Sequence, residues 1–290
     1  MGSNITVSFE FFPARSPEAQ SRLRDTARQL KPFSPAFLTV TYGAGGSTYD
    51  GTFDTVVDLY RDSGIDTASH LTFVATPAWK LATFARKLKQ AGVGRVIALR
   101  GDAPKGRAPD LYGGPGFFRS TPAFISFLKQ TGDFEISVAA YPEKHPDAPS
   151  LEADLDMLAH KCGAGADRAI TQFFFNNDDY YRFLDLAQKR GITAPIVPGI
   201  LPILDFEKMT SFAARCRASV PQSLADRFEG ADSADHLKVA AEVICEQVRD
   251  LAENGVEHFH IFTLNQAGMT IKACEALGLN GAGDQGSAAA

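Results

Sequence analysis

Short apolar runs recur along the chain and alternate with longer amphipathic segments. Runs such as RVIALRG and PIVPGIL are apolar nearly throughout, which is typical of parallel strands covered by helices. The runs predict eight strands, at Thr6–Phe12, Phe37–Tyr42, Thr67–Phe73, Arg95–Gly101, Glu135–Tyr141, Arg168–Phe175, Ala194–Leu201 and His258–Leu264. Strands that alternate with helices indicate βα units and a parallel sheet.

Capping residues mark the boundaries of the helices between these strands. A hydroxyl residue followed by proline predicts three helix starts, at Ser16-Pro17, Thr76-Pro77 and Thr121-Pro122. Other expected N-caps are Ser150, Asp205, Ser233 and Asn265. Glycines are expected to end helices at Gly64, Gly92, Gly191, Gly255 and Gly278.

The number of βα units predicts the fold class and the domain organisation. Eight units fit an α/β fold with a single (β/α)₈ TIM barrel, which typically needs ~250 residues. No Pro/Gly/Ser-rich linker divides the chain, so we expect one catalytic barrel over residues 1–279 and a disordered tail over 280–290. Two segments lie outside the repeat: the Gly/Pro-rich insertion Ala103–Arg119 and the turn-rich Pro221–Asp232, an extra segment in the seventh crossover.

Composition narrows the class of protein and its partners. The 290 residues include 34 acidic and 29 basic side chains, a net charge of −5 without the basic patch that nucleic acid requires. No apolar run reaches the ~18 residues of a membrane span, and the N-terminus lacks the pattern of a signal peptide. These features predict neither a nucleic-acid partner nor a membrane partner. Because the four cysteines are far apart in the sequence, we expect free thiols in a reducing cytoplasm.

Glu10 is the sharpest chemical signal in the sequence. Active sites of (β/α)₈ barrels lie at the carboxyl ends of the strands, and Glu10 lies near the end of the first one. Its neighbours Phe9 and Phe11 make the charged form costly, which predicts a raised pKa and a general acid. The alternative is a structural carboxylate that pairs with a buried arginine such as Arg100.

Three further polar residues follow strands or lie within them. Gly101 permits a tight turn that aims Asp102 into the barrel mouth, although an Asx-turn would explain Asp102 equally. Gln172 precedes three phenylalanines and can either contact a heterocycle or satisfy backbone groups. His70 is compatible with ligand contact and with core packing.

Two other features carry less weight. The segment Gly43–Thr48 is glycine-rich but lacks the Gly-Lys-Ser/Thr ending of a P-loop, so a flexible loop is favoured over a phosphate site. His258 and His260 share one face of a strand, and we expect no carboxylate or cysteine partner near them. We therefore predict no metal site.

Six motifs resemble those of one enzyme family, in the same order along nearly the whole chain. They span Val7–Pro13 (VSFEFFP), Val40–Ala44, Ala98–Asp102, Val138–Pro146, Ala169–Phe175 (AITQFFF) and Pro198–Pro202. The pattern resembles methylenetetrahydrofolate reductase of the bacterial type, which consists of the catalytic domain only.

This resemblance implies a (β/α)₈ barrel that binds FAD at its carboxyl-end face. NADH or NADPH reduces the flavin and leaves, and 5,10-methylenetetrahydrofolate then binds at the same face and is reduced to 5-methyltetrahydrofolate, which supplies methyl groups for methionine synthesis. Glu10 matches the acid that protonates the folate nitrogen, and Asp102 matches an aspartate that stabilises the cationic iminium. NADH is favoured because no Arg/Lys pair stands out for a 2′-phosphate, and relatives are homo-oligomers.

The resemblance also carries binding roles onto this sequence. Matching cofactor positions are Thr41, His70, Arg100, Asp102, Tyr112, Ala139, Tyr141, His145, Asp154, His160 and Lys161. Matching substrate positions are Glu10, Asp102, Gln172, Lys208, Phe212 and Gln266. The chain departs from the family at Met157 and His160, where relatives have Asn and Arg, and at Lys208 and Gln266, where the bacterial enzyme has Gln and Arg.

Two other functions stay open at this point. One is another flavin-dependent TIM-barrel oxidoreductase, similar to proline dehydrogenase. The other is a non-catalytic barrel that binds folate or flavin, which the departures at Met157 and His160 would accommodate because arginine is the stronger phosphate partner.

Overall fold

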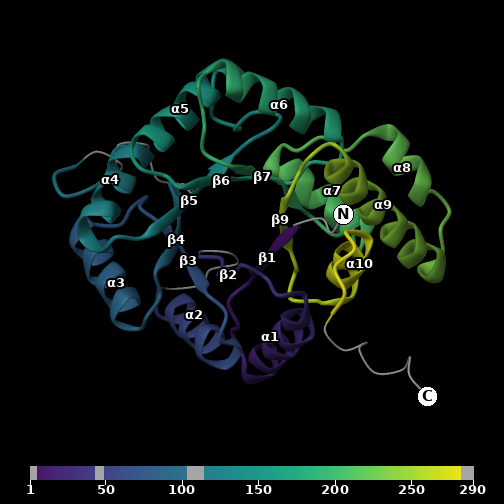
Figure 1. The fold of residues 1–290 in the computed structure, drawn as a ribbon, viewed down its shortest axis with the longest axis horizontal. Coiled ribbons are helices and arrows are strands. Elements are labelled where there is room, and N and C mark those ends of the chain that lie inside the picture. Colours follow the sequence, from purple (N-terminus) through teal and green to yellow (C-terminus); the bar gives the residue numbers. More distant parts are fainter. Residues whose placement is uncertain (1–4, 43–48, 103–113, 282–290) are drawn as a thin grey trace.

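The strands form one parallel barrel whose order follows the chain. The computed structural model describes residues 5–42, 49–102 and 114–281. The strands are β1 Thr6–Phe11, β2 Phe37–Val40, β3 Thr67–Thr72, β4 Arg95–Leu99, β5 Glu135–Ala140, β6 Arg168–Thr171, β7 Ile196–Val197, β8 Gly199–Ile200 and β9 His258–Phe262. Their order is β7-β6-β5-β4-β3-β2-β1-β9-β8, and all pairs are parallel. The first and last strands therefore lie side by side (Figure 1).

Helices surround this ring on the outside (Figure 1). They are α1 Pro17–Leu30, α2 Tyr49–Ser63, α3 Ala78–Gln90, α4 Thr121–Gly132, α5 Leu151–Gly163, α6 Asn177–Lys189, α7 Phe206–Cys216, α8 Gln222–Phe228, α9 Ser233–Glu253 and α10 Gly268–Ala276, with a 3₁₀ turn η1 at Lys31–Phe33. The predicted (β/α)₈ barrel is confirmed. None of the described helices is long and apolar enough to cross a membrane.

The seventh strand is not the continuous run Ala194–Leu201 that the sequence predicts. Pro198 divides it into β7, which pairs with β6, and β8, which pairs with β9. Proline has no N–H to donate to a neighbouring strand. The Pro198 carbonyl accepts a hydrogen bond from His260 N at 3.0 Å. Gly199 is required beside it, because a Cβ there would lie 2.2 Å from the Thr171 carbonyl oxygen. The barrel thus closes through a broken strand.

Most helix boundaries agree with their predicted caps. Three predicted N-caps accept a backbone N–H as expected: Ser16, Ser150 and Asp205. Two lie one residue away from their prediction, because Ser120 caps α4 in place of Thr121 and Asp232 caps α9 in place of Ser233. All five predicted glycine ends have a left-handed backbone: Gly64, Gly92, Gly191, Gly255 and Gly278.

Two other predicted caps are wrong. Helix α3 begins after Pro77 with no side-chain cap, and Thr76 Oγ1 donates to the Val74 carbonyl instead. Asn265 lies before α10 and joins the ends of β9 and β1: its amide accepts from Phe12 N at 2.9 Å and donates to Phe12 O at 3.0 Å. Its left-handed φ of 56° is held by these tertiary bonds, which a sequence pattern does not reveal.

The extra segment Pro221–Asp232 is more ordered than a turn-rich sequence suggests. It contains α8, whose Leu224 and Phe228 are buried in a second apolar cluster beneath α7 and α9. A helix of seven residues has little stability alone, so burial of these two side chains explains its formation.

The inside of the barrel has an apolar middle layer between two polar ends. Phe37, Ala68, Ile97, Ile170 and Val197 form a cluster separate from the main core beneath the helices. Charged side chains lie at the amino ends of the strands and Glu10 lies towards the carboxyl ends. The carboxyl end is where the site-residue predictions converge.

Candidate functional site

Glu10 lies near the carboxyl end of β1 between two histidines. Its Oε2 is 3.2 Å from His70 Nε2 of β3 and 3.5 Å from His260 Nε2 of β9. The contact with His70 lacks hydrogen-bond alignment and acts through charge, whereas His260 is within hydrogen-bond range. The Glu10 side chain is 16% exposed, so a ligand above the strands can reach it. Glu10, His70 and His260 are therefore the candidate reactive groups at the carboxyl end of the barrel.

The predicted rise in the pKa of Glu10 is wrong for the protein alone. Burial does raise this pKa, but the charge of His70 and the hydrogen bond from His260 outweigh it and lower the pKa to about 2. The sequence shows the phenylalanines beside Glu10 but not the histidines that the barrel brings to it. The alternative partner is wrong too, because Arg100 pairs with Asp147 at 2.7 Å.

A serine connects the two histidines of β9 beneath Glu10. Ser8 Oγ lies 2.8 Å from His260 Nδ1 and 3.0 Å from His258 Nε2. The statement that these histidines have no carboxylate neighbour is therefore wrong for His260. Ser8 and Glu10 are two residues apart on β1 and share one face, as His258 and His260 do on β9. Pairing of the first and last strands in a closed barrel was the signal that could have identified these four residues as neighbours.

A second cluster lies over the carboxyl ends of β4 and β5 and contains many of the predicted cofactor positions. His145 N donates to Asp154 Oδ2 at 2.7 Å, and His145 Nδ1 accepts from Asp147 N at 3.0 Å. Buried Lys161 donates to the Ala139 carbonyl at 2.9 Å. Desolvation lowers the pKa values of both Lys161 and His145. Two elements, the β5–α5 loop and α5, thus place an imidazole and a lysine side chain together.

Tyr141 completes this second cluster. Its ring meets that of His145 edge-on at 4.6 Å, and burial raises the pKa of its hydroxyl, which therefore stays protonated. Arg100, at the end of β4, reaches into the same cluster through Asp147. The predicted set Arg100, Tyr141, His145, Asp154 and Lys161 is brought together by the fold.

Other predicted residues are exposed at the rim of the barrel or lie outside the described residues. Asp102, His160, Lys208 and Gln266 are exposed, and Lys208 pairs with Asp205 at 2.8 Å. On α5, Asp154 and Lys161 are buried whereas Met157 and His160 are exposed. Tyr112 and the segment Gly43–Thr48 lie outside the described residues.

Two local features of the barrel mouth are the buried hydroxyl of Thr41 and the close packing of the Gly101 backbone against β3. Thr41 Oγ1 is buried and has no hydrogen-bond partner among the described residues. Gly101 has φ of 85°, and a Cβ there would lie 2.7 Å from the Thr72 Cβ. The backbone thus bends sharply directly before Asp102, as its sequence predicts.

An aromatic wall borders the site on the side of β6. Phe212 of α7 stacks on Phe173 with ring centroids 5.3 Å apart, and Arg215 lies 5.5 Å above the Phe212 ring. Gln172 Oε1 accepts from Phe173 N at 3.1 Å, which leaves the amide N–H groups free to contact a ligand. The structure therefore places Gln172 and Phe212 along the same edge.

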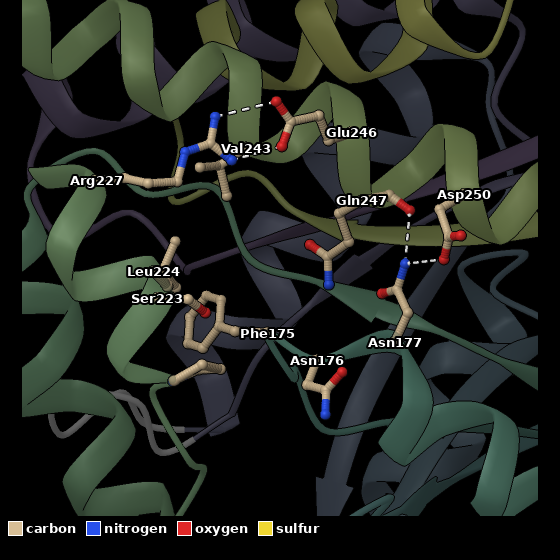
Figure 2. A pocket seen from close by; sticks show the side chains of 11 residues that line it. Phe175, Asn176, Asn177, Ser223, Leu224, Arg227, Val243, Glu246, Gln247 and Asp250 are labelled. Atoms are coloured by element: carbon tan, nitrogen blue, oxygen red, sulfur yellow. Dashed lines mark hydrogen bonds and ion pairs between the residues drawn. The ribbon is translucent and has the colours of Figure 1, made fainter.

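A separate cavity lies on the outside of the barrel (Figure 2). Its volume is about 370 Å³, and α6, α8 and α9 surround it. Figure 2 shows that two of its charged groups are already paired, Arg227 with Glu246 and Asp250 with the Asn177 amide N–H. It contains none of the predicted site residues, and the convergence of ionisable groups makes the barrel mouth the better candidate site.

The fold and its polar carboxyl-end mouth place the chain among (β/α)₈ barrels that carry their site at this end. A family model described as methylenetetrahydrofolate reductase matches residues 2–278. The 5,10-methylenetetrahydrofolate reductases of Pectobacterium carotovorum and Escherichia coli are each 39% identical over 278 residues, which cover 95% of this chain and 91% of theirs. The chain therefore belongs to the methylenetetrahydrofolate reductase family.

Similarity to solved structures supports the same fold. A Clostridium thermocellum protein described as binding two copies of 5-methyl-5,6,7,8-tetrahydrofolic acid superposes with a TM-score of 0.65, at 14% identity and 94% coverage of both chains. A 2,3-dimethylmalate lyase superposes with a TM-score of 0.53 at 10% identity. At these identities the likeness shows the barrel architecture alone.

Proposed function

We propose that this chain reduces 5,10-methylenetetrahydrofolate to 5-methyltetrahydrofolate, with FAD as the cofactor and NADH preferred over NADPH. NADH and folate act in turn at one site, in a ping-pong sequence, inside the cytoplasm. The observation that carries the proposal is Glu10, an ionisable carboxylate held by His70 and His260 at the end of the barrel where substrates bind.

The residues of the mouth fit a flavin dinucleotide. Arg100, His145 and Lys161 offer cationic and donor groups of the kind that a diphosphate requires, and Thr41 offers a buried hydroxyl that has no partner among the described residues. Protonated Tyr141 adds a donor beside them. When bound, the flavin supplies the hydride that the folate methylene group takes up.

Glu10 is assigned the proton transfer to folate. Reduction of the methylene bridge breaks a C–N bond: the carbon gains a hydride and the nitrogen gains a proton. Since the pKa of Glu10 is about 2 in the protein alone, its carboxylate is ionised at neutral pH and has to receive each proton before it donates it. The neighbouring histidines are placed to supply that proton.

The remaining residues orient and stabilise the substrate. Asp102 at the mouth provides negative charge for the cationic iminium that forms when the C–N bond breaks. Gln172 contacts the pterin with its free amide N–H groups, and Phe212 stacks on the substrate ring beside Phe173. Lys208 and Gln266 contact outer parts of the folate or nicotinamide from the rim.

Two half-reactions test the proposal separately. The purified protein, loaded with FAD, is mixed with NADH in a stopped-flow instrument, and the loss of flavin absorbance is followed. The reduced enzyme is then mixed with methylenetetrahydrofolate, and flavin reoxidation together with the appearance of methyltetrahydrofolate is measured. We expect both steps, with NADPH slower in the first. A protein that binds no flavin, or whose reduced flavin is not reoxidised by the folate, would contradict the assignment.

The proposed homo-oligomer has a simple test. Sedimentation of the purified protein should give a mass that is a multiple of the chain mass of 31.2 kDa. A species of 31.2 kDa at micromolar concentration would contradict it.

A further inference from the structure

A row of polar side chains continues below Glu10 through the interior of the barrel. His260 Nε2 is 3.5 Å from Glu10 Oε2, His260 Nδ1 is 2.8 Å from Ser8 Oγ, and Ser8 Oγ is 3.0 Å from His258 Nε2. His260 and Ser8 are fully buried, whereas His258, the first residue of β9, is partly exposed. The row therefore links Glu10 to the amino-end face of the barrel.

Every member of this row can both accept and donate a proton. An imidazole has two ring nitrogens, of which one accepts while the other donates, and a serine hydroxyl does both through one oxygen. An apolar layer fills the rest of the barrel interior at this height. Burial of these polar groups therefore costs free energy unless they hydrogen-bond to one another. The geometry is that of a relay rather than of isolated hydrogen bonds.

The surroundings of His258 favour a neutral ring. Arg95 of β4 and Arg168 of β6 both pair with Glu135 of β5, and their guanidinium groups lie 5.2 and 5.0 Å from the Phe37 ring, which meets the His258 ring edge-on at 5.8 Å. Burial, together with the positive charges of Arg168 and Arg95, lowers the pKa of His258 to about 3. A neutral imidazole can accept a proton at one ring nitrogen while it releases the proton of the other.

We propose that the proton consumed in each reduction reaches Glu10 from the amino-end face through His258, Ser8 and His260. His258 takes a proton from water at one nitrogen and releases one from Nε2 to Ser8 Oγ. The Ser8 hydroxyl proton passes to His260 Nδ1, and His260 Nε2 releases a proton to Glu10 Oε2. One proton enters and one leaves, and the hydride comes separately from the reduced flavin. The inference rests on the proposed function.

The route has a physical reason. Cofactor and substrate both bind over the carboxyl ends of the strands, so together they screen Glu10 from water on that side at the moment when the proton is needed. A supply from the opposite face avoids this conflict. Ser8, His258 and His260 are thus positioning residues that act through Glu10.

The test compares two interrupted relays with a matched control. Ser8→Ala removes the bridging hydroxyl and His258→Ala removes the entry imidazole. His236→Ala is the control, because His236 is also a partly buried histidine against a phenylalanine ring, Phe228 at 4.9 Å, but lies on α9 outside the barrel. We expect both relay variants to slow folate reduction by about 10- to 100-fold, at or below the lower end of what a positioned proton donor itself contributes, while flavin reduction by NADH is unchanged.

Two further readouts distinguish proton supply from structural damage. Added imidazole should restore folate reduction in His258→Ala, which leaves a cavity that imidazole fits, but not in His258→Leu. In the protein without ligands, ¹⁵N NMR of the His258 ring should change in Ser8→Ala and stay unchanged in His236→Ala. Relay variants that reduce folate at the control rate, with the wild-type pH profile, would overturn the inference. An inactive wild-type protein would instead overturn the proposed function.

Discussion

The two ends of the barrel interior use charge in opposite ways. At the amino ends of the strands, Arg95 and Arg168 share Glu135, and both guanidinium groups cover the ring of Phe37. Each charge there has a partner of opposite sign. At the carboxyl ends, in the part of the chain that the structure describes, Glu10 pairs with two histidines and the buried hydroxyl of Thr41 has no partner.

This difference separates stability from chemistry in one barrel. Paired charges hold the strands in register and gain nothing from a ligand, whereas incompletely satisfied groups gain hydrogen bonds when a ligand arrives. The charged cluster of Arg95, Arg168 and Glu135 at the amino end should therefore respond to substitution with a loss of stability, and the carboxyl end with a loss of activity or affinity. Four predictions examine that division, and the largest effect comes first.

Glu10→Gln should abolish most folate reduction while the protein stays folded. Glutamine keeps the shape of the side chain but cannot donate a proton as an acid, so we expect a loss of about 10²–10⁴-fold in the folate half-reaction. Reduction of the flavin by NADH is a hydride transfer that needs no acid at this position and should continue. Stopped-flow traces of the two half-reactions measure this. Folate reduction at the wild-type rate would end the assignment of Glu10.

Glu135→Gln should produce the opposite result at the amino end. It leaves Arg168 without its counter-charge among the described residues, whereas Arg95 keeps Asp66 at 3.2 Å. Since the side chains of Arg95, Arg168 and Glu135 are 20–30% exposed, solvent offsets part of the cost. We expect a loss of about 2 kcal/mol in the free energy of unfolding, below the 3–5 kcal/mol of a fully buried pair. Urea denaturation measures it, and activity per folded molecule should stay near wild type. A stable variant with impaired catalysis would refute the division between the ends.

Acid should destabilise the protein through the interior histidine row. His258 has a folded-state pKa near 3, below its ordinary value near 6.5, so the folded state favours the neutral ring. The stability that it contributes is complete above about pH 6.5 and is lost as the pH falls towards 3, with a slope of at most about 1.4 kcal/mol per pH unit for one proton.

Glu10 should add to this loss at lower pH. Its carboxylate has a pKa of about 2 in the fold, so its contribution is present above about pH 4.5 and is lost below it. Unfolding curves between pH 7 and 4 measure the effect of His258, and His258→Gln should flatten that part of the profile. An unchanged profile in this variant would show that other groups cause the acid sensitivity.

Thr41→Val should have the smallest effect, on cofactor affinity alone. If the buried hydroxyl bonds to bound FAD, its loss should weaken binding by about 1 kcal/mol, or roughly fivefold. Thr270→Val is the control, because its buried hydroxyl on α10 also lacks a partner among the described residues. Flavin fluorescence titration gives both dissociation constants. Equal affinities in the two variants would remove Thr41 from the cofactor site.

The βα pattern and most element boundaries could be predicted from local sequence. Strand and helix periods, prolines and glycines act within a few residues, so Ser16, Ser150 and Asp205 cap the helices that the sequence assigns to them. Family motifs likewise predicted which residues gather over β4 and β5. Pro198 lies inside the predicted seventh strand and is itself a local signal for a break, but which strand pairs with each half depends on the strands that lie on either side.

The sequence by itself determined the barrel, its family and the candidate acid at Glu10. Only the tertiary structure decided the electrostatics of that acid, because the pKa of Glu10 depends on His70 and His260, which approach it from strands far away in the chain. It likewise decided that Arg100 pairs with Asp147 and that Ser8 joins His258 to His260. Short-range steric preferences fix the elements, whereas charge interactions act through space and are settled only when the ring of strands closes.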